Sequence, residues 1–119
     1  MEGGTVTWRV FAVYLLVLAL ILLGTTASSQ VVVTEFNADW NKSNGVKWVG
    51  ELEDCGITKV DIVKYPKLQK KHKIVVVPTI IIFKDGEEVE RFQADISFSM
   101  KATRKELQEI INEQLMSDF

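Results

Sequence analysis

The chain has very little cysteine and histidine. Among its 119 residues, Cys55 is the single cysteine and His72 the single histidine. A disulfide within one chain needs two thiols, and a zinc site needs several ligands drawn mainly from these two residue types. The sequence therefore predicts no internal disulfide, no metal site and no bound cofactor.

The chain also lacks an excess of charge of either sign. Fourteen lysine and arginine residues stand against 16 aspartate and glutamate residues, and the formal net charge is −2. The longest basic run is Lys70–Lys73, which is better explained as a solvated helix face than as a phosphate-binding patch. We expect no nucleic-acid partner and no small-molecule substrate.

Charge is missing altogether from Val10 to Thr34, and Val10–Leu23 is unbroken apolar sequence. Two interpretations compete for residues 1–29. Arg9 before a short apolar run and small residues after it are typical of a cleaved signal peptide. A retained helix over residues 8–27 would be about 30 Å long, enough to span a bilayer, with Trp8 and Tyr14 near its interfaces. We favour the anchor, followed by one domain over residues 30–119.

The rest of the chain alternates strand and helix patterns. The predicted elements, in chain order, are a buried strand Val31–Phe36, a loop Asn37–Ser43, a helix Asn44–Asp54, a strand Ile57–Val63, a helix Pro66–His72, a strand from Thr79 to Phe83, a return strand Glu87–Gln93 and a helix Ala102–Met116. Apolar or β-branched runs indicate the strands, and apolar residues three or four apart indicate the helices. The order predicts an α/β domain.

Three local signals fix parts of this prediction. Asp85-Gly86 is typical of a hairpin turn. The return strand carries several charges, which suits a sheet edge. Thr103 and Glu106 have the spacing of a helix-capping box.

One segment carries a family resemblance. Trp40-Asn41-Lys42-Ser43-Asn44 stands where a thioredoxin has Trp-Cys-Gly-Pro-Cys. Three further stretches resemble the same family in the same order: Val31–Trp40, Lys59–Ile62 followed by Pro66, and Val75–Gly86 with its Pro-Thr pair. The matches cover about residues 31–115.

The resemblance implies a truncated thioredoxin-like α/β fold. Its sheet is expected to be mixed, with about four strands and flanking helices, because the family's first strand and first helix have no counterpart here. The segment Ala94–Lys101 is longer than in the family.

Both cysteines of the family motif are replaced, by Asn41 and Asn44. An amide forms no thiolate and so attacks no disulfide. We therefore expect a degenerate redox motif over Trp40–Asn44, no catalytic residues and no enzyme activity. Two readings stay open for the motif: contact with a partner, or drift after the chemistry was lost. Asn44 is also a candidate cap for the following helix.

The resemblance assigns roles to a few other residues. Pro78 aligns with the family's cis-proline, so Val77, Pro78 and Thr79 are expected beside a groove for an extended partner segment, with Trp40. The alternative is that the cis bond only serves the fold. Glu35 and Lys59 match a buried carboxylate and its facing lysine, and we expect a vestigial buried pair. Cys55 is expected to be a small buried hydrophobe.

The leading functional hypothesis is a non-catalytic thioredoxin-like accessory subunit. It would be anchored by one transmembrane helix, residues 8–27, in a larger complex of membrane-protein subunits, for example of respiratory type, in the mitochondrial inner membrane or the endoplasmic reticulum. The alternative is a luminal or secreted module, cleaved at its N-terminus, that binds extended peptides as non-catalytic disulfide-isomerase domains do. A third hypothesis is an enzyme that uses Cys55 alone.

Overall fold

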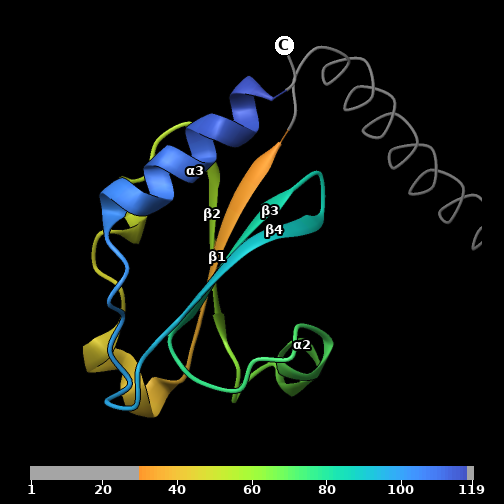
Figure 1. The fold of residues 1–119 in the computed structure, drawn as a ribbon. Coiled ribbons are helices and arrows are strands. Elements are labelled where there is room, and N and C mark those ends of the chain that lie inside the picture. The colour runs from red at the N-terminus through yellow and green to blue at the C-terminus, as the bar shows by residue number, and fades with distance from the viewer. Residues whose placement is uncertain (1–29, 118–119) are drawn as a thin grey trace, which may run out of the picture.

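The computed structural model describes residues 30–117. The elements, in chain order, are β1 (Val31–Asn37), the 3-10 helices η1 (Asp39–Asn44) and η2 (Val49–Glu51), β2 (Gly56–Asp61), α2 (Pro66–Lys71), β3 (Thr79–Lys84), β4 (Glu87–Gln93) and α3 (Arg104–Met116). Figure 1 shows the sheet in the middle, with α3 on one side and α2 on the other.

The four strands form one mixed sheet in the order β2-β1-β3-β4. β1 pairs parallel with β2 and antiparallel with β3, and β3 and β4 form an antiparallel hairpin. This confirms the predicted α/β fold with four strands. β1 lies at the centre and is buried along most of its length, as its β-branched sequence predicted.

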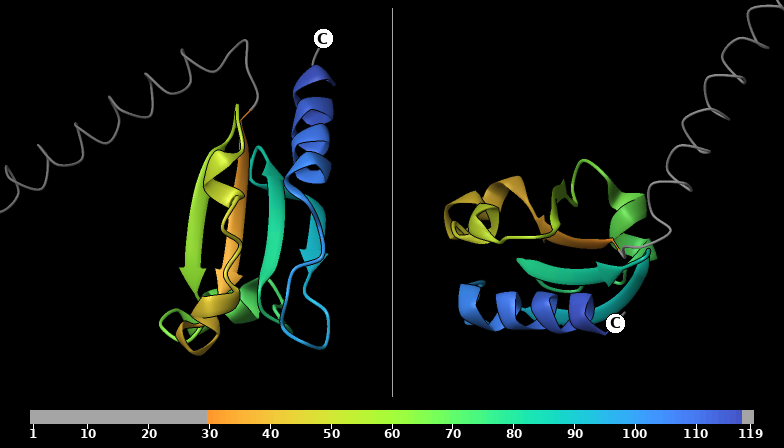
Figure 2. Two further views of the ribbon diagram at one scale, coloured as in Figure 1. Left: turned by 90° about the vertical axis from the view of Figure 1, so that its left-hand side faces the viewer. Right: turned by 90° about the horizontal axis from the view of Figure 1, so that it is seen from above.

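Two hydrophobic clusters lie on the two faces of the sheet. The larger one joins β1 and β3 to η2 and α3, and it is made of Val31, Val33, Val46, Val49, Leu52, Ile80, Ile82, Leu107 and Ile111. The smaller one, on the face that carries α2, is made of Phe36, Ala38, Ile62, Ile74, Val77 and Ile81. Figure 2 shows α3 running along its face, whereas α2 covers only one end of the other face.

The start of α3 follows its sequence signal. Thr103 is the N-cap; its side chain accepts a hydrogen bond from the Glu106 N–H, and the Glu106 side chain accepts one from the Thr103 N–H. Leu107 and Ile111 lie one turn apart on the buried face of the helix. The predicted capping box and amphipathic helix are confirmed.

The predicted helix Asn44–Asp54 is wrong. The chain forms η1 inside the segment that was expected to be a loop, and only the short turn η2 follows. Gly45 leaves the helical region, with φ −59° and ψ 151°. The Val46 N–H donates to the Glu35 carboxylate, 2.8 Å away, instead of to a helical carbonyl. The Glu35 carboxylate therefore takes the place of a helical carbonyl as the acceptor for Val46, directly after Gly45 ends the helical turn.

The predicted N-terminal helix and the domain boundary at residue 29 lie outside the described residues. Within residues 30–117, no helix is long and apolar enough to cross a membrane.

Candidate functional site

The motif Trp40–Asn44 lies in η1, directly after the end of the central strand. Trp40 is 64% exposed, and its ring meets that of Phe98 edge to face with the centroids 5.4 Å apart. Phe98 belongs to the loop between β4 and α3 and is 42% exposed. Two segments far apart in sequence thus present one aromatic pair to solvent.

Asn41 is turned into the protein, and it is only 4% exposed. Its Nδ2 lies 3.2 Å from Asn37 Oδ1, 3.3 Å from the Val77 carbonyl oxygen and 3.3 Å from the Phe98 carbonyl oxygen. An amide nitrogen has two hydrogens, so these three acceptors share them. One side chain therefore joins η1, the segment before Pro78 and the β4–α3 loop.

Asn44 has a different environment. It is exposed, and its Nδ2 donates to Asn41 Oδ1 at 2.9 Å. Since η1 ends at Asn44 and no α-helix begins there, Asn44 is not the helix cap that was considered for it. Its amide instead supports the orientation of the Asn41 side chain.

The peptide bond between Val77 and Pro78 is cis. Val77 and Thr79 are buried, and the Pro78 carbonyl accepts a hydrogen bond from the Ala94 N–H at 3.0 Å. The structure brings this segment to the Trp40 motif through Asn41, but the Val77 carbonyl already accepts the Asn41 amide. A partner segment at this site would meet exposed side chains before it met the Val77 backbone.

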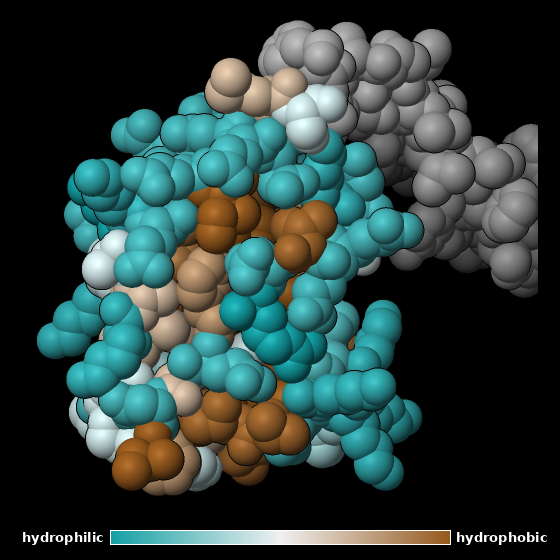
Figure 3. All heavy atoms as spheres, in the orientation of Figure 1, coloured by the Kyte–Doolittle hydropathy of each residue, from teal (hydrophilic) through white to brown (hydrophobic). Residues whose placement is uncertain are grey.

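Exposed apolar side chains gather beside this segment. Trp40, Ile96 and Phe98 make up what we call the motif surface, and Ile96 is 100% exposed. Figure 3 shows hydrophobic surface at the end of the molecule that Figure 1 assigns to η1 and the β4–α3 loop. Sequence reasoning missed Ile96 and Phe98, although the unusual length of Ala94–Lys101 pointed to this loop.

The loop that carries Ile96 and Phe98 is held by Asp95. The Asp95 carboxylate accepts hydrogen bonds from the Ser97 N–H and hydroxyl and from the Ser99 N–H, and it lies 3.4 Å from the Lys101 ammonium. The Ser97 hydrogen bonds, with smaller help from Ser99 and Lys101, lower the pKa of Asp95 to about 2. The loop is a side-chain-stabilised turn, which fixes its apolar residues.

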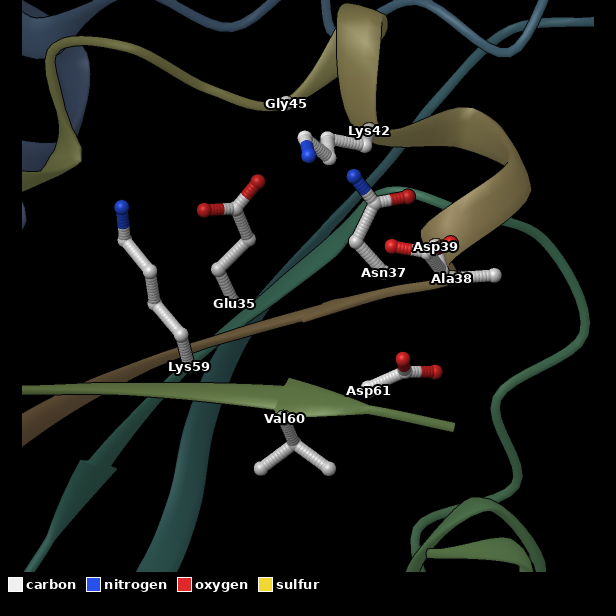
Figure 4. Close-up of a pocket in the computed structure, with 9 residues that line it drawn as sticks. All are labelled: Glu35, Asn37, Ala38, Asp39, Lys42, Gly45, Lys59, Val60 and Asp61. Atoms are coloured by element: carbon white, nitrogen blue, oxygen red, sulfur yellow. The ribbon is translucent and has the colours of Figure 1, made fainter. Parts of the chain in front are cut away.

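A cavity of about 330 Å³ opens behind η1, between it and the ends of β1 and β2. Figure 4 shows the Glu35 carboxylate between Lys59 and the turn at Gly45. The charged and polar side chains that line it are Glu35, Asn37, Asp39, Lys42, Lys59 and Asp61. The cavity mixes carboxylates and ammonium groups in nearly equal number.

The expected buried pair of Glu35 and Lys59 is only half correct. The two residues are opposite each other on β1 and β2, and Glu35 is 4% exposed, but Lys59 is exposed. The ion pairs that the described residues form do not join them. β2 is a sheet edge, so the lysine turns to water, and the Val46 N–H is the fixed partner of Glu35.

Cys55 is half-buried, just before β2. Burial raises the pKa of its thiol, and the neighbouring Asp54 carboxylate raises it further. β1 and β2 start together, with Val32 opposite Gly56. Cys55 therefore lies at the opposite end of β1 from η1, about 16 Å away at about 3.3 Å per residue.

His72 follows α2 as its C-cap residue, and its ring lies 5.3 Å from Phe36 and 5.4 Å from Phe83 between centroids. Burial against these rings lowers the pKa of His72. These contacts give the histidine a packing role on the smaller cluster.

A central parallel strand, a motif turn after it and a cis-proline beside that turn define a thioredoxin-like domain. The thioredoxin family model matches residues 23–113. A thioredoxin from Chlamydia trachomatis is 46% identical over an alignment of 70 residues, which covers 54% of this chain and 69% of that protein. The chain belongs to the thioredoxin family.

Further relatives agree. The chloroplastic thioredoxin Y1 of Arabidopsis thaliana is 44% identical over 41 residues, 34% of this chain, and the chain spans 24% of the length of that relative. The X-ray structure of Fasciola hepatica thioredoxin has 25% identity and a TM-score of 0.56, over 80% of this chain and 90% of that one.

Two expectations are corrected by these relatives. The expectation that the chain is not an enzyme is contradicted, because its relatives are thioredoxins, which are redox enzymes. The expected single-pass localisation in a mitochondrial or endoplasmic reticulum membrane is also contradicted. The finding that overturns it is that two of the relatives are chloroplastic thioredoxins.

Proposed function

We propose that this thioredoxin-family domain binds extended polypeptide segments at the motif surface, next to the cis Val77–Pro78 bond. The observation that carries the proposal is the Trp40–Phe98 pair, two aromatic rings that stay largely exposed while they pack on each other. Aromatic side chains supply large contact areas at polypeptide-binding surfaces. With Ile96 they offer apolar positions on two neighbouring loops.

The support beneath the rings favours binding. Asn41 ties η1 to the Phe98 backbone, and Asp95 fixes the turn before it. A surface that is already ordered loses little conformational entropy when a segment docks on it. Because Val77 is buried and its carbonyl accepts the Asn41 amide, binding would depend chiefly on side-chain contacts with the rings.

The proposal assigns polypeptide binding, and not thiol chemistry, to the motif surface. The relatives of the chain are thioredoxins, which suggests a redox role for the domain. At the motif itself, Asn41 and Asn44 supply no thiolate. Thiol chemistry in this chain falls to Cys55, which lies at the other end of β1 from the motif surface.

The test is fluorescence anisotropy of a labelled, cysteine-free peptide of alternating aromatic and polar residues, titrated with the full chain. We expect Trp40→Ala and Phe98→Ala each to weaken binding about tenfold, the loss of one buried aromatic contact. Tyr65→Ala is the matched control, because Tyr65 is an exposed aromatic residue away from the motif surface. Equal affinity for all four proteins would refute the proposal.

A second candidate function is single-thiol exchange at Cys55, favoured by the family and by the partial exposure of the thiol. The Cys55 thiolate would attack a partner's disulfide, form a mixed disulfide and release the partner's second sulfur as a thiolate. Cys55→Ser should abolish any mixed disulfide with a model disulfide peptide and the thiolate that its formation releases. Unchanged thiolate release in Cys55→Ser would exclude this function and leave peptide binding untouched.

A further inference from the structure

The sheet has two edges, and they are protected very differently. β4 carries Glu87, Glu88, Glu90 and Arg91, and its pairing with β3 is irregular between Ile82 and Phe83. Charges and bulges of this kind hinder the addition of another strand. β2 pairs with β1 in an unbroken register over six residues and carries only Lys59 and Asp61 as charges.

The outer side of β2 has open backbone groups. The Ile62 N–H donates to the Asn37 carbonyl of β1, so Ile57, Lys59 and Asp61 present their N–H and C=O groups away from β1. Within the described residues, the one backbone partner of these outward groups is the Tyr65 N–H on the Asp61 carbonyl. A carbonyl has two lone pairs and can accept a second bond.

We propose that β2 is an interface between two copies of this chain, paired antiparallel through Lys59–Asp61 into a continuous sheet. In the register that places Val60 opposite Val60, Lys59 of each copy lies opposite Asp61 of the other. Opposite charges that face each other across two strands stabilise the pair. The pairing ends there, because the chain turns after Asp61, where the Tyr65 N–H donates to the Asp61 carbonyl.

Neighbouring registers fit less well. A shift of the copy by two residues places Lys59 opposite Lys59, and like charges directly opposite are destabilising. A shift by one residue places Lys59 opposite Val60, whose N–H and C=O groups point toward β1, so the two edges could not exchange hydrogen bonds. The sequence of β2 therefore complements itself best with the two-fold axis at Val60.

Disulfide trapping tests the register. In the full chain with Cys55→Ser, kept in a mild nonionic detergent, we expect Val60→Cys to form a covalent dimer under gentle oxidation. Facing residues at a non-hydrogen-bonded position lie about 4.5 Å apart between Cα atoms, within reach of a disulfide. Thr58→Cys is the matched control, since its counterpart would lie about 13 Å away. A Val60→Cys chain that stays folded and links no faster than Thr58→Cys overturns the proposal.

Charge exchange tests the chemistry. Sedimentation of the full chain should show self-association that Lys59→Asp and Asp61→Lys each weaken about tenfold or more. A mixture of the two variants should associate as the original does, because each copy then supplies the charge that the other lacks. Glu90→Lys on β4 is the control and should change nothing. A chain that stays monomeric, or a mixture that does not recover association, overturns the proposal.

Discussion

Two parts of this domain, which we call its halves, use different partners for their backbone hydrogen bonds. From Thr79 to Met116, the backbone hydrogen bonds belong mainly to a β-hairpin and a capped helix, and the Asp95 side chain holds only the loop between them. From Asn37 to Cys55, polar side chains do much of this work: Glu35 receives the Val46 N–H, and Asn41 bonds to two carbonyl oxygens. We therefore expect the stability of the packed half, Thr79–Met116, to depend mainly on apolar contacts. The stability of the polar half, Asn37–Cys55, should depend more on a few buried polar atoms.

The largest effect is expected in the packed half. Leu107 is fully buried between α3 and the sheet, so Leu107→Ala should lower the free energy of unfolding by about 3 kcal/mol. Leu115→Ala, in the last turn and only partly buried, is the control and should cost clearly less. Urea denaturation followed by circular dichroism measures both. Equal losses would mean that α3 does not pack as described.

The next effect tests the polar half. Asn41→Ala should lower the free energy of unfolding by about 2 kcal/mol, because the buried Val77 carbonyl and the partly buried Phe98 carbonyl lose their donor. Hydrogen exchange should also become faster in the β4–α3 loop. Asn44→Ala is the control; Asn44 is exposed, and its loss should cost no more than about 0.5 kcal/mol. A harmless Asn41→Ala would remove the contrast between the halves.

A smaller effect concerns the cap of α3. Thr103→Ala should cost about 1 kcal/mol, since the Glu106 N–H loses its acceptor at the start of the helix. Thr103→Ser keeps the hydroxyl and should retain most of the stability. Thermal unfolding of the three proteins distinguishes the cap from simple side-chain truncation, which would affect both variants alike.

The smallest effect is the pH response of the loop under the motif surface. The pKa of Asp95 is lowered from 3.8 to about 2 in the folded protein. The stability that the ionised Asp95 carboxylate adds to the folded protein is therefore complete above about pH 4, and it is lost as the pH falls through about 2. Ser97→Ala removes the hydrogen bond that the hydroxyl donates to Asp95 and should raise the pKa of Asp95 toward its ordinary value. A carboxyl titration by NMR that is the same in both proteins would contradict this.

Much of the fold was predictable from local patterns. The strand β1, the hairpin at Asp85-Gly86 and the capping box at Thr103 all carry signals within a few residues, and the structure has them in place. The helix Asn44–Asp54 was wrongly predicted because its apolar spacing is helical, yet Gly45 and the Glu35 carboxylate redirect the chain. That carboxylate is eleven residues away, beyond the range of any local pattern.

The candidate site was predictable only in outline. The resemblance by itself pointed to Trp40, Asn41, Val77 and Pro78. It did not indicate that Asn41 would be buried and bonded to Phe98, because the segment Ala94–Lys101 has no counterpart of that length in the family. The expected partner of Glu35 also changed, since the edge position of β2 leaves Lys59 in water.

The sequence by itself determined the family, the order of the four strands and the absence of thiols from the motif. These properties depend on residue identity and on periodicity, which are local. Only the tertiary structure decided that the Asn41 side chain is buried, which aromatic residues form the motif surface and which sheet edge is open. These depend on contacts between residues up to 57 positions apart, and the free energy of such contacts is settled only when the whole chain packs.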